Sequence, residues 1–426
     1  MNMKTILKSS VAAAALMAVT APVMAQSNIE SGNAKVKLKI YGHVNKAMLW
    51  GDDGNNSRTF VVDNAASATR FGFIATAPVN ADFSFGAQIE TEFKSNSSGA
   101  GSAPQPGTTG VAISNANSAN AGLTANDTNT GDTSFVERVA EVTMDHKRFG
   151  KVSLGNGGEA GDGQTEYNMG GGVTNFTGAL GLGALGATTL FDKTNNRYYR
   201  ATLKTTTAAA GITNASGISL GDGNRDDRVM YATPRLMGFR GQTSFSSGGT
   251  GAVSLDLDNK YGAFKVQAGV GYTNYAGRSA SGQDAVSGSI AVLHDSGINA
   301  SIAAAHRRNK KNVGTQASTS GDNTEYHDTG NSNSVGGTLG YLAKIFGVGP
   351  TGFQADYYTI ANGRVQGSSV DTFAFGINQE FTDIGTDVYL GYRNFNHDIG
   401  NREKTTYSVG DIDDVNIVMT GVRVKF

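Results

Sequence analysis

The sequence contains no cysteine, only six prolines among 426 residues, and no run of 18 or more apolar residues beyond its first 25 positions. The absence of cysteine excludes disulfide bridges and thiolate metal sites. The absence of a long apolar run argues against membrane-spanning helices. Charge of one sign is also missing, since 35 basic residues face 36 acidic ones. A chain with balanced charge has no excess positive potential to attract nucleic acid, and we expect no such partner.

Signatures of catalysis and of metal binding are missing as well. The six histidines are scattered without an H-E-x-x-H pattern, and no G-x-S-x-G motif occurs, so we do not expect an enzyme or a cofactor. The run from Asp222 to Asp227 resembles half of a calcium loop, but Thr233 stands where a bidentate glutamate would complete it. The alternative to a calcium site is a solvated turn, which is the usual role of such a run.

The first 25 residues carry a separate signal. Lys4 and Lys8 precede a short apolar core, and Val23 to Ala25 fits a small-x-Ala cleavage site. This pattern predicts a cleaved secretory signal peptide over residues 1–25, which leaves 26–426 as the mature domain. An uncleaved anchor helix is the alternative, but the apolar run is too short for it.

The mature chain is rich in glycine and alternates repeatedly between apolar and polar residues. Between Asp82 and Lys94, for example, phenylalanine, alanine and isoleucine alternate with acidic and amide side chains. A period of two residues is the signature of a β-strand with two unlike faces. We count sixteen such segments, with boundaries near 35–50, 67–77, 81–94, 133–145, 150–157, 226–233, 238–247, 251–260, 262–274, 285–294, 299–309, 332–345, 350–361, 370–380, 385–396 and 414–426.

The connections between these segments alternate between short and long. Pro78, Pro234 and Pro350 fall at short connections, and none of them interrupts a strand centre. Short turns at one end and long loops at the other are typical of bacterial outer-membrane barrels, and strands of about 10 residues span their apolar band. A secreted sandwich or propeller would also alternate, but its inner faces would need bulky apolar residues where this chain has Arg, Lys, Glu, Gln and Asn. The fold class predicted is therefore all-β, a 16-stranded antiparallel transmembrane barrel.

Two connections are unusually long. Residues 95–132 are rich in Gly, Ser, Ala, Asn and Thr and lack periodicity, which predicts an external loop. Residues 158–225 form the longest connection and combine acidic residues with a small apolar stretch and a basic one. A long loop inside a compact domain is either functional or disordered.

Several short motifs resemble those of the Gram-negative general-diffusion porin family. They are Thr69 to Phe73 followed by Phe85 to Glu90, Phe149 to Gly155, Arg228 to Pro234 with Gly238 and Phe239, and the alternating segment that ends on Phe426. The resemblance implies a homotrimer of 16-stranded barrels in the outer membrane, in contact with its lipid and lipopolysaccharide. Phe426 is implied as the signal read by the barrel-assembly machinery, and small hydrophilic solutes as the cargo of passive diffusion.

The resemblance also implies a pore constriction. In the family, the loop after strand 5 folds into the pore, and wall arginines face acidic groups on that loop. Arg70 and Arg228 match wall arginines, and Glu90 lies on the polar face of the segment 81–94. The loop acids would be Glu159, Asp162 and Glu166. Asn156 stands where many members have another arginine, which leaves charge preference open. The length of 158–225 leaves open whether this loop constricts or plugs the pore.

Arg138 presents a conflict between resemblance and charge. The family places an inward arginine on strand 4, yet an inward Arg138 would turn Glu137 and Glu141 toward lipid. The opposite parity puts Glu137, Glu141 and Thr143 inward and only Arg138 outward. Charge counting favours this second parity unless a β-bulge intervenes.

Passive diffusion is the function that the sequence predicts. Two alternatives stay open at this stage. The long loops would also suit a barrel that serves mainly as a surface adhesin or structural anchor, and the same wall would suit a substrate-selective porin.

Overall fold

A computed structural model of the chain describes residues 32–33, 35–94, 97–98, 134–183, 190–199, 220, 222–275, 283–309, 316–317, 323–324, 331–363 and 366–426. The predicted signal peptide and almost all of the predicted external loop 95–132 lie outside these residues, so both stay predictions. No helix among the described residues is long and apolar enough to cross a membrane.

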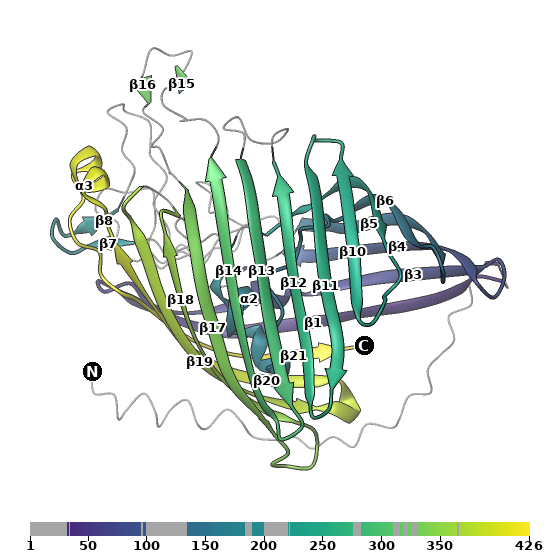
Figure 1. The fold of residues 1–426 in the computed structure, drawn as a ribbon. Helices are drawn as coiled ribbons and strands as arrows, with labels where there is room; N and C mark the ends of the chain where they lie inside the picture. The colour runs from purple at the N-terminus through teal and green to yellow at the C-terminus, as the bar shows by residue number, and fades with distance from the viewer. Residues whose placement is uncertain are drawn as a thin grey trace.

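Sixteen long antiparallel strands form one closed barrel (Figure 1), as the alternation predicted. Strand β1 closes it, because β1 pairs with β3 on one side and with the last strand, β21, on the other. The wall strands are β1 Lys37–Asp52, β3 Arg70–Pro78, β4 Phe83–Lys94, β5 Ser134–His146, β6 Gly150–Gly158, β9 Arg225–Ala232, β10 Phe239–Ser246, β11 Gly251–Tyr261, β12 Phe264–Asn274, β13 Gln283–His294, β14 Ile298–Asn309, β17 Ser332–Ala343, β18 Thr351–Ala361, β19 Ser369–Phe381, β20 Thr386–Asp398 and β21 Val415–Lys425.

The two ends of the barrel differ. Short turns, such as 79–82 and 262–263, join the strands at one end, which faces the right and the bottom of Figure 1. Longer connections leave the other end and carry the small hairpin β15 Gln316–Ala317 with β16 Asn323–Thr324, and helix α3 Asn401–Tyr407. We call the end with the longer connections the loop end and the other the turn end.

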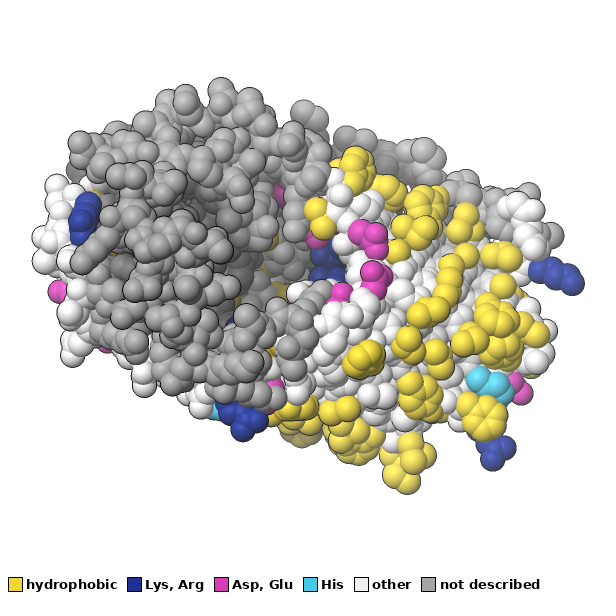
Figure 2. Space-filling view, turned by 90° about the horizontal axis from the view of Figure 1, so that it is seen from above, with side chains coloured by type: hydrophobic (Ala, Val, Ile, Leu, Met, Phe, Trp, Pro, Cys, Tyr) yellow, Lys and Arg dark blue, Asp and Glu magenta, His cyan; other side chains and the backbone are white. Residues whose placement is uncertain are grey.

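The wall has its polarity reversed relative to a soluble protein. Along β18, Phe353 and Tyr357 point outward and are 38% and 54% exposed, whereas Gln354 between them points inward and is 3% exposed. The same alternation coats the outer wall with hydrophobic side chains (Figure 2). A closed sheet with an apolar exterior is the form in which strands can lie in lipid, since closure leaves no backbone edge unpaired.

The second wall strand does not begin where the sequence predicted. The alternation suggested a strand from residue 67, but β3 begins at Arg70. An additional strand, β2 Ser57–Asp63, pairs with the C-terminal half of β1. Residues 64–69 interrupt the wall between β2 and β3, with Ala65–Ser67 forming the 3-10 turn η2. Asn64 still donates to the Asn45 carbonyl of β1, and the Thr69 carbonyl accepts from Phe93 of β4, so that the residues between them leave the sheet. We call residues 64–69 the inward lobe, because their contacts lie on the lumen side, as described below.

Candidate functional site: a charged constriction inside the barrel

Arginines and glutamates from neighbouring strands meet on the inner wall of β3, β4 and β5. Glu90 accepts a hydrogen bond from Tyr41 at 2.9 Å and from Arg138 Nε at 2.7 Å, and Arg70 Nη1 lies 3.7 Å from it. Arg138 also pairs with Glu92. The structure therefore brings three of the sequence-predicted residues, Arg70, Glu90 and Arg138, into one cluster.

The sequence-based preference for an outward Arg138 is wrong, and a β-bulge is the reason. The pairing of β4 with β5 shifts between Glu90 and Thr91, so that Glu90 faces Val139, Thr91 faces Glu137, and Arg138 has no partner of its own. One extra residue reverses the alternation on either side of it. Arg138 and Glu141 can therefore both point inward, and Glu137 is exposed on the outer side.

Arg228 on β9 is a structural anchor of the inner wall. Its side chain is 5% exposed, it pairs with Glu141 at 2.8 Å, and it donates to the carbonyls of Gly155 and Gly158. A Cβ on Gly157 would lie 2.7 Å from its Nη2 atom, so a larger residue there would displace the guanidinium from these partners. Arg228 thereby fixes the point at which the chain leaves β6.

The chain between β6 and β9, residues 159–224, is called the long loop here. It begins inside the barrel, where the Ala160 amide bonds to Ser244 of β10 and the Tyr167 amide to Ser289 of β13. Further along, Asn168 and Gln354 of β18 exchange hydrogen bonds. These contacts with inward side chains of three wall strands show that the described start of the loop lies along the inner wall.

The next part of the loop packs against glycines of β18 to β20. It contains the turn η4 Gly171–Asn175 and the short helix α2 Gly178–Gly183, which lies within the barrel outline in Figure 1. Phe176 is fully buried against β20, where a Cβ on Gly391 would lie 2.2 Å from its ring. Val173 packs near Gly376 in the same way. Phe176 belongs to an apolar core inside the barrel, with members that include Leu182, Tyr358, Ile360, Phe395 and Ile417.

Beyond α2, the long loop is attached to the loop end of the barrel. Its hairpin, β7 Phe191–Asp192 with β8 Arg197–Tyr198, adds to the segment before β21 through a bridge between Asp192 and Ile412. Asp192 is fully buried and accepts a hydrogen bond from the Gly410 amide at 3.0 Å. Figure 1 shows β7, β8 and α3 gathered at this rim.

The loop acids do not share one environment. Glu159 is 3% exposed and bonds to the Asn224 backbone, so it holds the base of the loop. Asp162 and Glu166 lie within electrostatic reach of Arg138 and Arg225. Burial raises the pKa of Asp162, and enclosure by the barrel, with Asp222 and Asp162 nearby, raises the pKa of the exposed Glu166 carboxyl to about 7.

Sequence reasoning missed two residues of this cluster. Asp222 accepts hydrogen bonds from Thr165 and Ser287, and burial raises its pKa to about 6. Arg225 is exposed at the start of β9 and acts electrostatically on Asp162 and Glu166. Both belong to the run that was interpreted as a calcium loop or turn. That run instead continues into a wall strand, and the described residues contain no group of three or more acidic or histidine ligands placed for a metal.

Phe426, the predicted assembly signal, closes the barrel at the turn end. Its backbone exchanges hydrogen bonds with Gly42 of β1, both at 3.0 Å. Its ring lies over Gly42, where a Cβ would approach to 2.8 Å, and its side chain remains 64% exposed outside the wall.

Comparison with protein families gives one match, to the model of the Gram-negative porin family, over residues 12–400. The chain belongs to the Gram-negative porin family. A search of curated proteins finds no match for this porin. Membership makes the chain a non-enzymatic outer-membrane channel for diffusion, which agrees with the apolar outer wall and the charged lumen.

Solved structures share the fold of this porin at low sequence identity. The anion-selective porin from Comamonas acidovorans is 14% identical with a TM-score of 0.53, and the match covers 92% of this chain and 100% of that one. The outer membrane channel DcaP of Acinetobacter baumannii is 13% identical with a TM-score of 0.52, over 93% and 99% of the chains. Salmonella typhi OmpF in complex with daunomycin is 14% identical with a TM-score of 0.50, over 92% and 98%.

Proposed function

We propose that small hydrophilic solutes cross this porin between the β3–β5 wall and the start of the long loop. Arg70 and Arg138 line one side of that passage, and Asp162 and Glu166 line the other. The single observation that carries this proposal is the electrostatic proximity of Asp162 and Glu166, on the long loop, to Arg138 on the wall. Opposed charges in a narrow, partly desolvated passage act strongly on a permeating ion.

The described charges of this passage predict a moderate ion preference. Arg138 is paired with Glu90 and Glu92, and Arg228 with Glu141, so these wall charges are compensated locally. Arg70 shares Glu90 with Arg138 at the longer distance of 3.7 Å and is compensated only in part. The charges left to act on a solute are therefore those of Arg70 and Arg225 against those of Asp162 and Glu166. Selectivity is therefore set by which loop carboxyls are ionised.

Planar-bilayer recording of the purified mature protein tests the proposal. Asp162→Asn and Glu166→Gln should each shift the reversal potential in a salt gradient toward anions, and Arg70→Ala should shift it toward cations. Asp295→Asn serves as the control, because Asp295 pairs with Lys260 outside the lumen passage at the turn end. Unchanged reversal potentials in all three lumen variants would place the constriction elsewhere.

Two further features are proposed with it. The family motifs, which extend from the second wall strand to the last, support a homotrimer. A homotrimer should insert into bilayers with conductance steps in groups of three. The pattern of residues 1–25 supports a signal peptide, so the mature protein should begin at Gln26 by N-terminal sequencing. A monomer on native electrophoresis, or a mature chain that retains Lys4, would contradict the respective proposal.

A further inference from the structure

We propose that the inward lobe, residues 64–69, is a second constriction element, and that Asn64 is the residue that positions it. The proposal rests on the constriction proposed above and adds a part that comes from the wall strand itself. Its basis is an interruption of strand pairing together with a set of hydrogen bonds that hold the displaced residues inside the barrel.

The interruption is defined by the register of β1. Lys46 faces Asp63 at the end of β2, and His43 faces Arg70 at the start of β3. Two residues of β1 thus lie opposite the six residues of the lobe. The four surplus residues cannot stay in the sheet, and Asn64, Ala68 and Thr69 are all buried.

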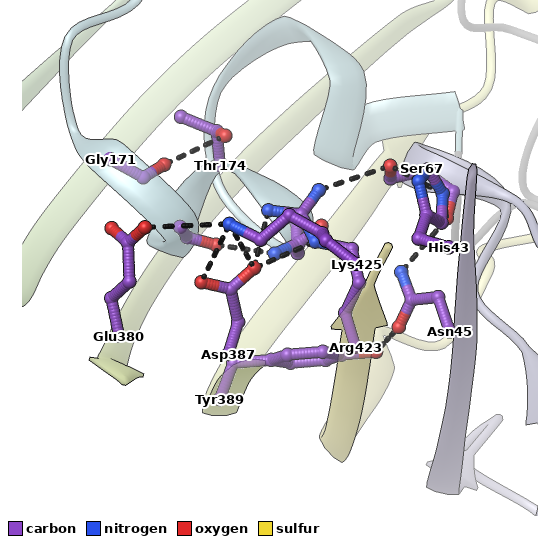
Figure 3. A network of polar contacts seen from close by, with 12 residues as sticks. His43, Asn45, Ser67, Gly171, Thr174, Glu380, Asp387, Tyr389, Arg423 and Lys425 are labelled. Atoms are coloured by element: carbon purple, nitrogen blue, oxygen red, sulfur yellow. Dashed lines mark hydrogen bonds and ion pairs between the residues drawn. The ribbon is translucent and has the colours of Figure 1, made fainter. Parts of the chain in front are cut away.

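Side chains of β1 and β21 hold the lobe on the lumen side (Figure 3). Asn45 donates to the Ser67 carbonyl at 2.8 Å, and its backbone amide donates to Thr69 at 3.0 Å. A His43 ring nitrogen lies 2.9 Å from the Ala68 carbonyl, and Arg423 bonds to the Ser67 hydroxyl at 3.1 Å. Backbone groups released from the sheet are thereby satisfied inside the barrel.

The lobe joins the long loop inside the barrel through Asn64, which is fully buried. Its amide donates to the Asn175 carbonyl of η4 and to the Tyr389 hydroxyl, both at 2.9 Å. The described residues of the long loop contact the inner wall at β10, β13, β18 and β20, and the lobe meets them at η4. These described parts of the loop and the lobe together form an inner collar along that part of the wall.

The lobe also orients a constriction charge. Arg70 Nε donates to the Ala68 carbonyl at 3.0 Å, which directs the guanidinium toward Glu90. Because a donor held by a rigid acceptor loses little further freedom, the lobe fixes where this positive charge stands in the passage. Displacement of the lobe should therefore change both the width of the pore and its selectivity.

Two variants test this inference. Replacing residues 64–69 by two threonines would restore continuous pairing with β1, and we expect a higher single-channel conductance and passage of larger polyethylene glycols. Asn64→Asp keeps the shape but removes the amide donors to Asn175 and Tyr389, and we expect the same changes in conductance and polymer passage to a smaller degree. Asn259→Ala is the control, because Asn259 bonds to the Met237 carbonyl at the turn end.

The outcomes separate this inference from the constriction proposal. If both lobe variants fold as heat-modifiable barrels with wild-type conductance, polymer cutoff and reversal potential, the lobe is not a constriction element. If the Asp162 and Glu166 variants shift the reversal potential in that same case, the constriction proposal stands alone. If the threonine replacement does not fold, Asn64→Asp decides the question, since an unchanged conductance and polymer cutoff in that variant would overturn the inference.

Discussion

Arg393 of β20 and Asp356 of β18 form an ion pair whose two side chains are fully excluded from solvent, with Nη2 to Oδ2 at 2.7 Å and Nη1 to Oδ1 at 3.1 Å. The same Arg393 donates to the Phe176 carbonyl, and Asp356 accepts from the Gly178 amide. A wall arginine that a sequence would count as a lumen charge therefore serves to hold the long loop.

Arg393→Ala should loosen the loop without unfolding the barrel. Removing one partner of a buried pair leaves an uncompensated charge, at a cost of about 3–5 kcal/mol. We expect faster proteolysis within the long loop and noisier, larger conductance, measured on folded protein. Arg393→Met with Asp356→Leu, which removes both charges, should behave closer to wild type. Equal loop proteolysis in wild type and Arg393→Ala would contradict this role.

Gly391→Ala should have a similar effect through shape alone. The added Cβ would lie 2.2 Å from the Phe176 ring, so the ring and the loop must move away from β20. Loss of packing of Phe176 should raise conductance and lower the temperature at which the loop becomes sensitive to protease. Gly251→Ala is a matched strand-glycine control, because a Cβ there meets nothing within 4 Å. Identical behaviour of the two variants would reject the prediction.

Ion selectivity should depend on pH between about 8 and 5. Glu166 and Asp222 have pKa values raised to about 7 and about 6, so both carboxyls bind protons as pH falls through this window. Each proton removes a negative charge from the loop, in the case of Glu166 beside Arg225 and Arg138, and the reversal potential should move toward anion preference at low pH. Glu166→Gln should flatten most of this response. A reversal potential that is constant over the window would show that these groups do not face the ion path.

A pair of cysteines should lock the rim hairpin. Lys193 and Asp411 lie on adjacent antiparallel backbones, joined by the Lys193 amide to the Asp411 carbonyl at 2.9 Å, and both side chains are exposed. Such pairs lie within the distance that a disulfide spans, and the native chain has no cysteine to compete. We expect Lys193→Cys with Asp411→Cys to form a bridge on oxidation, seen by electrophoresis, and to reduce brief closures. Absence of the bridge would argue against a docked hairpin.

The sequence was sufficient to locate the sixteen wall strands, because alternation with period two is a local property and the two faces of each strand meet unlike surroundings. Arg70 and Arg228 could be oriented for the same reason. The sequence could not show which side chains of β5 face inward. The bulge at Arg138 adds one residue without a recognisable change in composition, and only the pairing with β4 reveals it.

Neither the lobe nor the contacts of the long loop with the wall could be predicted from local sequence patterns. Asn64 bonds to Asn175 and Tyr389, which lie 111 and 325 residues away in sequence, and nothing in the small polar residues around it distinguishes a lobe from a turn. Arg228 and Glu159 were chosen as pore charges, but burial gives both of them structural contacts. Arg225 and Asp222 were overlooked because their run resembled a different motif.

The lobe makes the width of the opening independent of the diameter of the barrel wall. The diameter of a barrel follows from its strands and their stagger, so a wall of sixteen strands comes with one width. In the proposal above, four surplus residues between β2 and β3 narrow the opening while the wall keeps its sixteen strands. Lengthening or shortening this one insertion would give a graded series of pores on a single scaffold, in which sieving is adjusted independently of assembly.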